Sequence, residues 1–209
     1  MSEARASRVL AELRRRIVMN EFAPGAVLTE LGLAAELACS QSSVREALLR
    51  LEGEGLVLRA GRQGTTVTDL DLGSATEILN LRRRLELRGA RRSIRRLSAG
   101  DLAGLEAIQE RMERAARAGD AWAVLEADMD LHLALFRASG LFAMVPILAR
   151  VMLHSYRFRL WAPWHRRPLT QTALRHRPIL AALRAGDAAA LNHELGAHLD
   201  TIVERNVAA

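Results

Sequence analysis

The sequence predicts a mainly α-helical protein of two domains, an N-terminal winged helix-turn-helix at 1–70 and a C-terminal all-α six-helix bundle at 71–209. Three observations predict this fold class. Apolar residues recur at helical spacing through most of the chain. Two short β-runs in the first third flank a glycine-punctuated tip, and no strand pattern follows residue 74. With 209 residues, 50% of them hydrophobic, the chain is long enough for two cores.

The first 70 residues are expected to form three helices and a hairpin. Thr29 and Ser40 are the expected N-caps of the second and third helices, because their side-chain oxygens can accept from the first turn. The expected helices span 7–20, 30–38, and a third from Ser40 to Gly53 or Gly55. The expected strands are 56–59 and 65–68, with the tip at 60–64 between them and a linker at 69–73.

The second domain is expected to contain helices alone. Gly119-Asp120 and Gly186-Asp187 each fit a helix end followed by an acidic helix start, which suits the helix dipole. The expected helices span about 74–97, 100–118, 120–139, 142–161, 171–185 and 187–206.

Charge and composition bound the class of protein. The net charge is +6, but residues 1–70 hold nine arginines against nine acidic residues, so the excess lies in the second domain. Net charge therefore does not identify the DNA-binding half. The single cysteine, Cys39, excludes an intrachain disulfide and a cysteine-based zinc finger. Because no apolar run is long enough to cross a bilayer and no charged-then-apolar leader opens the chain, we expect a cytoplasmic protein with no membrane partner.

The start of the third helix has the composition of a DNA-reading segment. It reads Ser40, Gln41, Ser42, Ser43 and then, two residues on, Arg45. Helix-turn-helix proteins place this part of the second helix of the pair in the major groove of double-stranded DNA. There Gln41 suits adenine, Arg45 suits guanine, and the serines can reach phosphate or base edges. The alternative is a good helix start with a solvated arginine.

The hairpin tip adds two further candidate contacts. Arg62 can reach a minor groove or a phosphate, and Gly64 lets the backbone approach closely.

Over about residues 7–69 the sequence resembles the DNA-binding domain of the GntR family. The stretches that carry the resemblance are 24–28, 33–34, 39–48 and 51–57. The family often has Arg at the place of Gln41, so an operator sequence cannot be transferred from it.

Four polar residues of the second domain lie on apolar helical stripes. Asp128 and His132 are four residues apart and so share one helix face. His176 lies on a stripe with Leu180, and His198 lies on the inward face of the last helix. One carboxylate and three imidazoles suit a divalent metal ion such as zinc, nickel, iron or manganese. Singly, each histidine is also compatible with a hydrogen-bonded core residue.

The second half resembles the FCD ligand-binding domain of the FadR-type branch, and the helix count resembles the VanR-like subgroup. The stretches that carry this resemblance are 127–140, 175–179 and 186–187, with His198. The resemblance implies that Asp128, His132, His176 and His198 bind a metal ion, with zinc the first candidate, and that a small carboxylate effector can complete its coordination. It also implies that Arg82 binds the effector, since an arginine can clamp a carboxylate through two hydrogen bonds. Pro178 is expected to disturb the helix beside His176.

These features predict a regulator rather than an enzyme. We expect a homodimer that presents two recognition helices to operator DNA, with the effector controlling DNA affinity. One alternative is a metal-dependent hydrolase or lyase that uses the Asp/His site, although Asp130 lies on another helix face and no general base is evident. A second alternative is a metal ion that only stiffens the helical domain.

Overall fold

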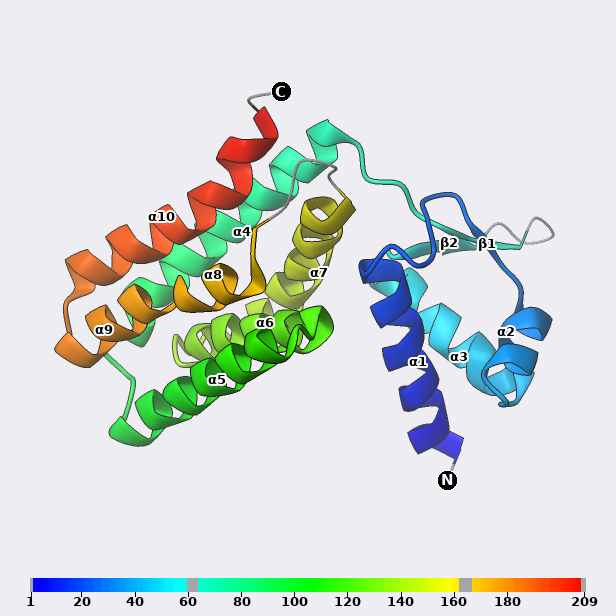
Figure 1. Ribbon diagram of the computed structural model, residues 1–209, viewed down its shortest axis with the longest axis horizontal. Coiled ribbons are helices and arrows are strands. Elements are labelled where there is room, and N and C mark those ends of the chain that lie inside the picture. Colours follow the sequence, from blue (N-terminus) through cyan, green and yellow to red (C-terminus); the bar gives the residue numbers. More distant parts are fainter. Residues whose placement is uncertain (1, 60–63, 162–166, 208–209) are drawn as a thin grey trace. The chain divides into compact units, whose positions relative to one another are not determined.

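The computed structural model describes residues 2–59, 64–161 and 167–207 (Figure 1), and the side chains within 5–59, 64–161 and 167–201. The chain forms two compact units, one of Met1–Ser74 with Tyr156–Ala162 and the other of Ala75–Ser155 with Pro163–Ala209. In the described residues, no helix is both long and apolar enough to span a membrane.

The first unit is a winged helix-turn-helix. Its elements are α1 (Ser2–Val18), β1 (Val27–Leu28), α2 (Glu30–Glu36), α3 (Gln41–Gly53), β2 (Val57–Arg59) and β3 (Thr65–Val67). The strands form an antiparallel sheet in the order β1-β3-β2, with Val57 opposite Val67 and Val27 opposite Thr66. The predicted fold of this half is thereby confirmed, and β1 is a strand that the sequence reading had not predicted.

Two capped helix starts define the helix-turn-helix. The Thr29 hydroxyl accepts from the backbone N–H of Gly32 at 3.2 Å, and the Ser40 hydroxyl accepts from that of Ser43 at 3.2 Å. Both caps lie where the sequence predicted them. Behind them, an apolar core fixes α3 against α1, and it includes the fully buried Leu13, Ile17, Val44, Leu48 and Leu51.

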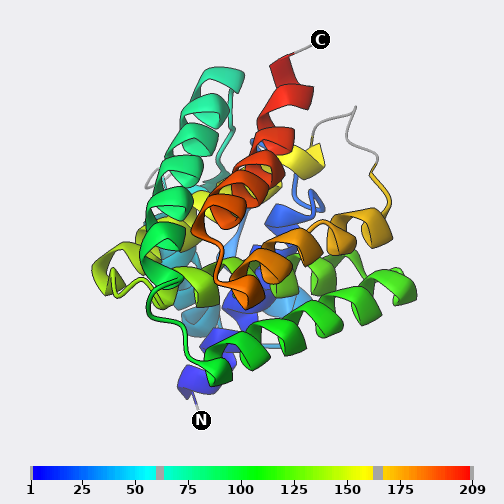
Figure 2. The same cartoon turned by 90° about the vertical axis from the view of Figure 1, so that its left-hand side faces the viewer.

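The second unit is built from helices. They are α4 (Leu72–Ser93), α5 (Ala99–Ala118), α6 (Ala121–Arg137), α7 (Val145–Trp161), α8 (Leu169–Leu174), α9 (Arg177–Ala185) and α10 (Ala188–Val207), with a short 3-10 turn η2 (Phe142–Met144). The first residues of α4, 72–74, and the last of α7, 156–161, belong to the first unit. Helices α4 and α10 run side by side in both views (Figures 1 and 2). They are antiparallel, because Arg83 pairs with Asp200 while Arg91 bonds to Asn192. Leu105, Met112, Leu131, Leu148 and Leu191 belong to the buried core.

One predicted helix of this unit is divided, so the expected count of six helices is wrong. The helix expected over 171–185 is two helices, α8 and α9, which are separated at Arg175 and His176. The physical reason is Pro178, which lies in the first turn of α9. Proline lacks a backbone N–H and is tolerated at a helix start but not in a helix interior. The break places His176 at the N-cap position of α9.

The C-terminal end of α4 and the turn after it carry an exposed arginine stripe, which we define as Arg88, Arg91, Arg92, Arg95 and Arg96. These five side chains line a shallow surface hollow. Arg92 donates to the carbonyl of Ser139 at 3.2 Å, and Arg91 donates to Asn192 at 3.0 Å. Among the side chains that the structure describes, the salt bridges include none from this stripe to a carboxylate. Five positive charges of the second domain therefore lie close together here.

Candidate metal centre and DNA-reading surface

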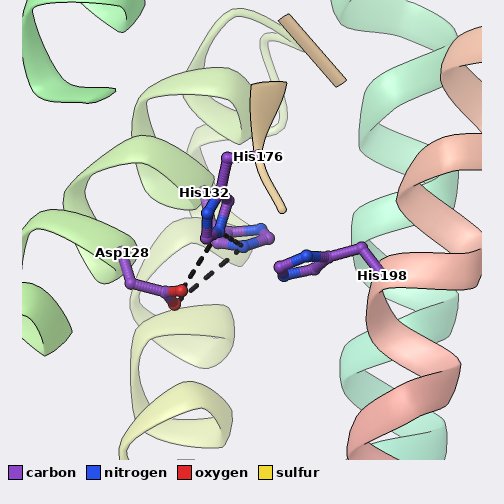
Figure 3. A group of neighbouring side chains, drawn as sticks. All are labelled: Asp128, His132, His176 and His198. Carbon is purple, nitrogen blue, oxygen red and sulfur yellow. Dashed lines mark hydrogen bonds and ion pairs between the residues drawn. The ribbon is translucent and has the colours of Figure 1, made fainter. Parts of the chain in front are cut away.

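The four predicted ligands meet inside the second unit (Figure 3). Asp128 and His132 come from successive turns of α6, His176 from the start of α9 and His198 from α10. One ligand atom from each lies within 4.8 Å of all the others, and all four residues are buried. Because Pro178 starts a new helix just beyond His176, this side chain approaches the centre from a helix end rather than from a helix side.

The distances show that the ligand atoms converge. His176 Nε2 lies 3.1 Å from Asp128 Oδ1 and 3.3 Å from His132 Nε2. His132 Nε2 lies 3.9 Å from Asp128 Oδ2. The ring of His198 has its centroid 4.4 Å from that of His176 and 5.1 Å from that of His132. Three imidazoles and one carboxylate thus surround one point.

The outer nitrogens of two histidines are held by acceptors. His132 Nδ1 bonds to the carboxylate of Glu86 on α4, and His176 Nδ1 lies 3.3 Å from the carbonyl of Ala173. A carboxylate or carbonyl accepts, so the hydrogen-bond network assigns the proton to Nδ1 in both rings. With Nδ1 held in this way, each Nε2 can give up its own proton and offer a lone pair to a metal ion, which is the usual arrangement of metal-binding histidines.

The charge states also suit a cation. Burial by itself would raise the pKa of Asp128, but the hydrogen bond from His176 and the nearby positive charges outweigh it and hold this pKa well below the usual range. Burial, together with the charges of His176 and His132, lowers the pKa of His198 well below its usual value. An ionised carboxylate and a neutral imidazole are the forms that bind a metal ion.

The donor set therefore fits a divalent metal ion. Nitrogen and carboxylate oxygen donors suit zinc and its transition-metal neighbours. His198 adds a second sign: among the described residues its Nδ1 is buried without a hydrogen-bond partner. A buried polar atom normally has a partner, so an unpaired imidazole nitrogen beside three other donors indicates a ligand position. The group could hold a metal ion.

Arg82 and Glu86 of α4 lie next to the four candidate ligands, near Asp128 and His132 respectively. The predicted effector residue Arg82 is 1% exposed; its Nε donates to Glu86 Oε1 at 2.7 Å and its Nη1 to the Ser155 hydroxyl on α7 at 2.9 Å. Arg82 Nη2 lies 3.9 Å from Asp128 Oδ2. Burial opposes ionisation of Glu86, but the charges of His132 and Arg82 outweigh it and lower the pKa of Glu86. The sequence analysis missed Glu86 and Ser155; the spacing of four between Arg82 and Glu86 was the available signal.

On the DNA-reading surface, four of the predicted side chains are exposed at the start of α3. These are Ser40, Gln41, Ser42 and Arg45. Arg45 pairs with Glu30 of α2, with Nη2 2.7 Å from Oε2, and the guanidinium is more than half exposed. The hydrogen bond to Glu30 raises the pKa of Arg45 above its usual value, so this side chain stays cationic. The Glu30 contact was not predicted.

The remaining predicted DNA contacts have different surroundings. Ser43 is 4% exposed and its hydroxyl lies 2.9 Å from that of Ser40, so both serines hold the helix start together. Gly64 has φ +86°, a left-handed conformation that glycine adopts without strain. Arg62 lies outside the described residues.

The fold, the exposed start of α3 and the buried Asp/His group define a class of protein, a helix-turn-helix protein with a helical second domain that could hold a metal ion. Comparison with known proteins identifies the family. Residues 5–67 match the bacterial regulatory proteins of the gntR family, and residues 77–201 match the FCD domain. The chain belongs to the GntR family and carries an FCD domain, as the sequence analysis predicted.

Three comparisons illustrate the relationship. The HTH-type transcriptional regulator McbR of Escherichia coli is 30% identical over 141 residues, which are 68% of this chain but only 62% of McbR. The Nta operon transcriptional regulator of Aminobacter aminovorans is 29% identical over 191 residues, 90% of this chain and 89% of that protein. The solved structure of E. coli McbR/YncC superimposes with a TM-score of 0.80 at 25% identity, covering 97% of this chain and 96% of that one. The matched families are transcription regulators, not enzymes, so the hydrolase alternative finds no support.

Proposed function

We propose that this transcription regulator binds operator DNA under the control of a small carboxylate effector, which binds in a metal-containing helical domain. The observation that carries the proposal is the convergence of Asp128, His132, His176 and His198 within 4.8 Å inside the FCD domain. Zinc is the first candidate for the metal ion, with nickel, manganese and iron as alternatives. A bound divalent ion outweighs the single negative charge of Asp128, so it attracts an anionic ligand.

The metal proposal is tested by comparing a variant of one candidate ligand with a control variant two residues away on the same helix. Asp128→Asn removes the carboxylate from the centre, whereas Asp130→Asn changes an exposed residue of the same helix that pairs with Arg111. Isothermal titration with Zn²⁺ should show a large loss of affinity in the first variant and none in the second. Equal affinity in both would refute the metal site.

The effector proposal is tested on metal-loaded protein. Small carboxylic acids are screened by thermal shift, because a true effector stabilises the folded state by mass action. Hits are then added to a mobility-shift assay with the promoter region, with and without a chelator. If chelation lowers the melting temperature but no acid raises it, the metal ion is only structural. The contact between Arg82 and the effector stays a prediction. Arg82 already donates hydrogen bonds to Glu86 and Ser155, so an effector must either bind beside these bonds or replace them.

The DNA-reading proposal rests on the exposed start of α3. We propose that Gln41, Ser42 and Arg45 contact base edges or phosphates, that Ser40 and Ser43 orient this segment, and that the wing adds Arg62 and Gly64. Gln41→Ala should cost about 1–3 kcal/mol of operator binding, roughly 5- to 150-fold in Kd, and leave nonspecific binding unchanged. Arg50→Ala, on the same helix and paired with Glu46, is the control. A uniform loss on all DNA sequences would contradict base reading by Gln41.

We further propose that the protein acts as a cytoplasmic homodimer. Two copies related by a two-fold axis present two recognition helices to a pseudo-palindromic operator. Analytical ultracentrifugation at micromolar concentration, with and without operator DNA, tests this state. A monomer that binds one half-site with full affinity would refute it.

A further inference from the structure

We propose that Glu86 is a positioning residue of the metal centre: it accepts a hydrogen bond from the Nδ1–H of His132 and so commits His132 Nε2 to the metal ion. The inference rests on the metal binding proposed above, and it concerns a residue on α4 that is not a ligand. Glu86 is 3% exposed, and its two carboxylate oxygens serve different partners. Oε2 bonds to His132 Nδ1, and Oε1 accepts from Arg82 Nε at 2.7 Å.

The two bonds explain why this position needs a carboxylate. An imidazole can coordinate a metal through either nitrogen, and the choice follows from the hydrogen bond that the other nitrogen makes. A carboxylate offers an acceptor to both Arg82 and His132 at once, because it has two oxygens and no proton of its own when ionised. An amide has only one oxygen, so a glutamine at 86 would have to turn an N–H group toward one of the two donors.

Arg82 holds Glu86 in the orientation that this role requires. It lies one turn earlier on α4, and its Nη1 donates to the hydroxyl of Ser155 on α7. The guanidinium is therefore fixed between two acceptors on different helices, and it keeps the buried charge of Glu86 compensated. The resulting chain of hydrogen bonds runs from Ser155 through Arg82 and Glu86 to His132. It ties one ligand to two helices, α4 and α7, that supply no ligand themselves.

The decisive test compares Glu86→Gln with Ser93→Ala in the full-length protein. Ser93 is also buried on α4, two turns further on, and its hydroxyl donates to the Leu135 carbonyl of α6 at 2.6 Å. Both substitutions thus weaken a link between the same two helices, and only Glu86 touches a ligand. Zn²⁺ affinity is measured by chelator competition, and the visible absorption of bound Co²⁺ reports the ligand geometry.

We expect Glu86→Gln to weaken Zn²⁺ binding about 10- to 100-fold and to change the Co²⁺ spectrum, the usual scale for losing a partner of a metal-binding histidine. Ser93→Ala should lower the melting temperature and leave both readouts unchanged. Unchanged affinity in Glu86→Gln, or an equal loss in both variants, would overturn the proposal, because either result makes Glu86 a structural counter-ion of Arg82.

A measurement on the unmodified protein covers the case in which Glu86→Gln fails to fold. The ¹⁵N spectrum of the histidine rings distinguishes protonated from coordinated nitrogens. In the zinc-loaded protein we expect His132 Nδ1 to carry a slowly exchanging proton and Nε2 to show the coordination shift. Coordination of His132 through Nδ1 would overturn the proposal without any variant.

Discussion

Gly89 of α4 lies directly against the ring of Phe136 on α6, and a side chain added at this position should loosen the metal centre. A Cβ atom at this position would lie 2.3 Å from Cδ2 and 2.7 Å from Cε2 of the Phe136 ring, which is 2% exposed. Normal contact between carbon atoms needs about 3.5 Å, so the ring or the helix must move by about 1 Å. Gly89 lies three residues after Glu86 and Phe136 four residues after His132, so the displacement falls beside the Glu86–His132 bond.

Two effects of Gly89→Ala oppose each other. Alanine in a helix interior is favoured over glycine by about 1 kcal/mol. Overpacking a dense core costs about 1–3 kcal/mol, and a full ångström of displacement belongs at the upper end. We therefore expect a net loss of about 1–2 kcal/mol in the free energy of unfolding, or roughly 3–8 °C in Tm. Zn²⁺ affinity should fall as well.

Gly104→Ala is the matched control. Gly104 lies inside α5, is exposed, and would place its Cβ in open space. The same substitution should therefore raise stability by up to about 1 kcal/mol. Both variants are followed by circular dichroism during thermal and urea unfolding, and Zn²⁺ binding is titrated. The packing argument is refuted if Gly89→Ala is as stable as Gly104→Ala.

Three further outcomes are expected. Zn²⁺ at 100 times its Kd should stabilise the protein by about 2.7 kcal/mol in calorimetry, and Asp128→Asn should abolish most of this gain; no gain in the unmodified protein would argue against the site. The hydrogen bonds from Arg177 lower the pKa of Glu113 to about 2. Glu113→Gln should therefore cost at most about 1 kcal/mol above pH 4.5, because the Arg177 side chain is 62% exposed and water screens the pair. The difference should vanish as the pH falls toward 2, so a difference that grows in acid would contradict this expectation. Ser98→Ala removes the capping box that Ser98 forms with Asp101 at the start of α5 and should cost about 1 kcal/mol in urea unfolding, whereas an unchanged midpoint would mean that the cap is dispensable.

Local sequence patterns predicted most of this fold. The helix caps at Thr29 and Ser40 and the inward stripes that bear Asp128 and His198 follow from spacing within a few turns, and the structure shows each in place. The strand β1 escaped prediction because it has two residues, too few for an alternating pattern, and exists through its pairing with β3.

The unpredicted parts of the site are contacts between residues far apart in sequence. Glu86 meets His132 across 46 residues and Arg82 meets Ser155 across 73, and only the packing of α4 against α6 and α7 brings them together. The Arg45–Glu30 pair likewise depends on the crossing of α2 and α3. The divided helix is a different case: Pro178 predicts a disturbance of the helix from sequence alone, but whether it kinks a helix or starts a new one depends on the packing around it.

The arginine stripe on α4 has a practical consequence for handling this protein. Five closely spaced guanidinium groups attract any polyanion, and such binding depends steeply on salt and little on sequence. Retention on a heparin column, or a shifted band with random DNA at low ionic strength, will therefore report the helical domain as much as the helix-turn-helix. Operator recognition should therefore be measured as the difference in affinity between operator and scrambled DNA at physiological salt. The arginine stripe contributes equally to binding of both DNAs.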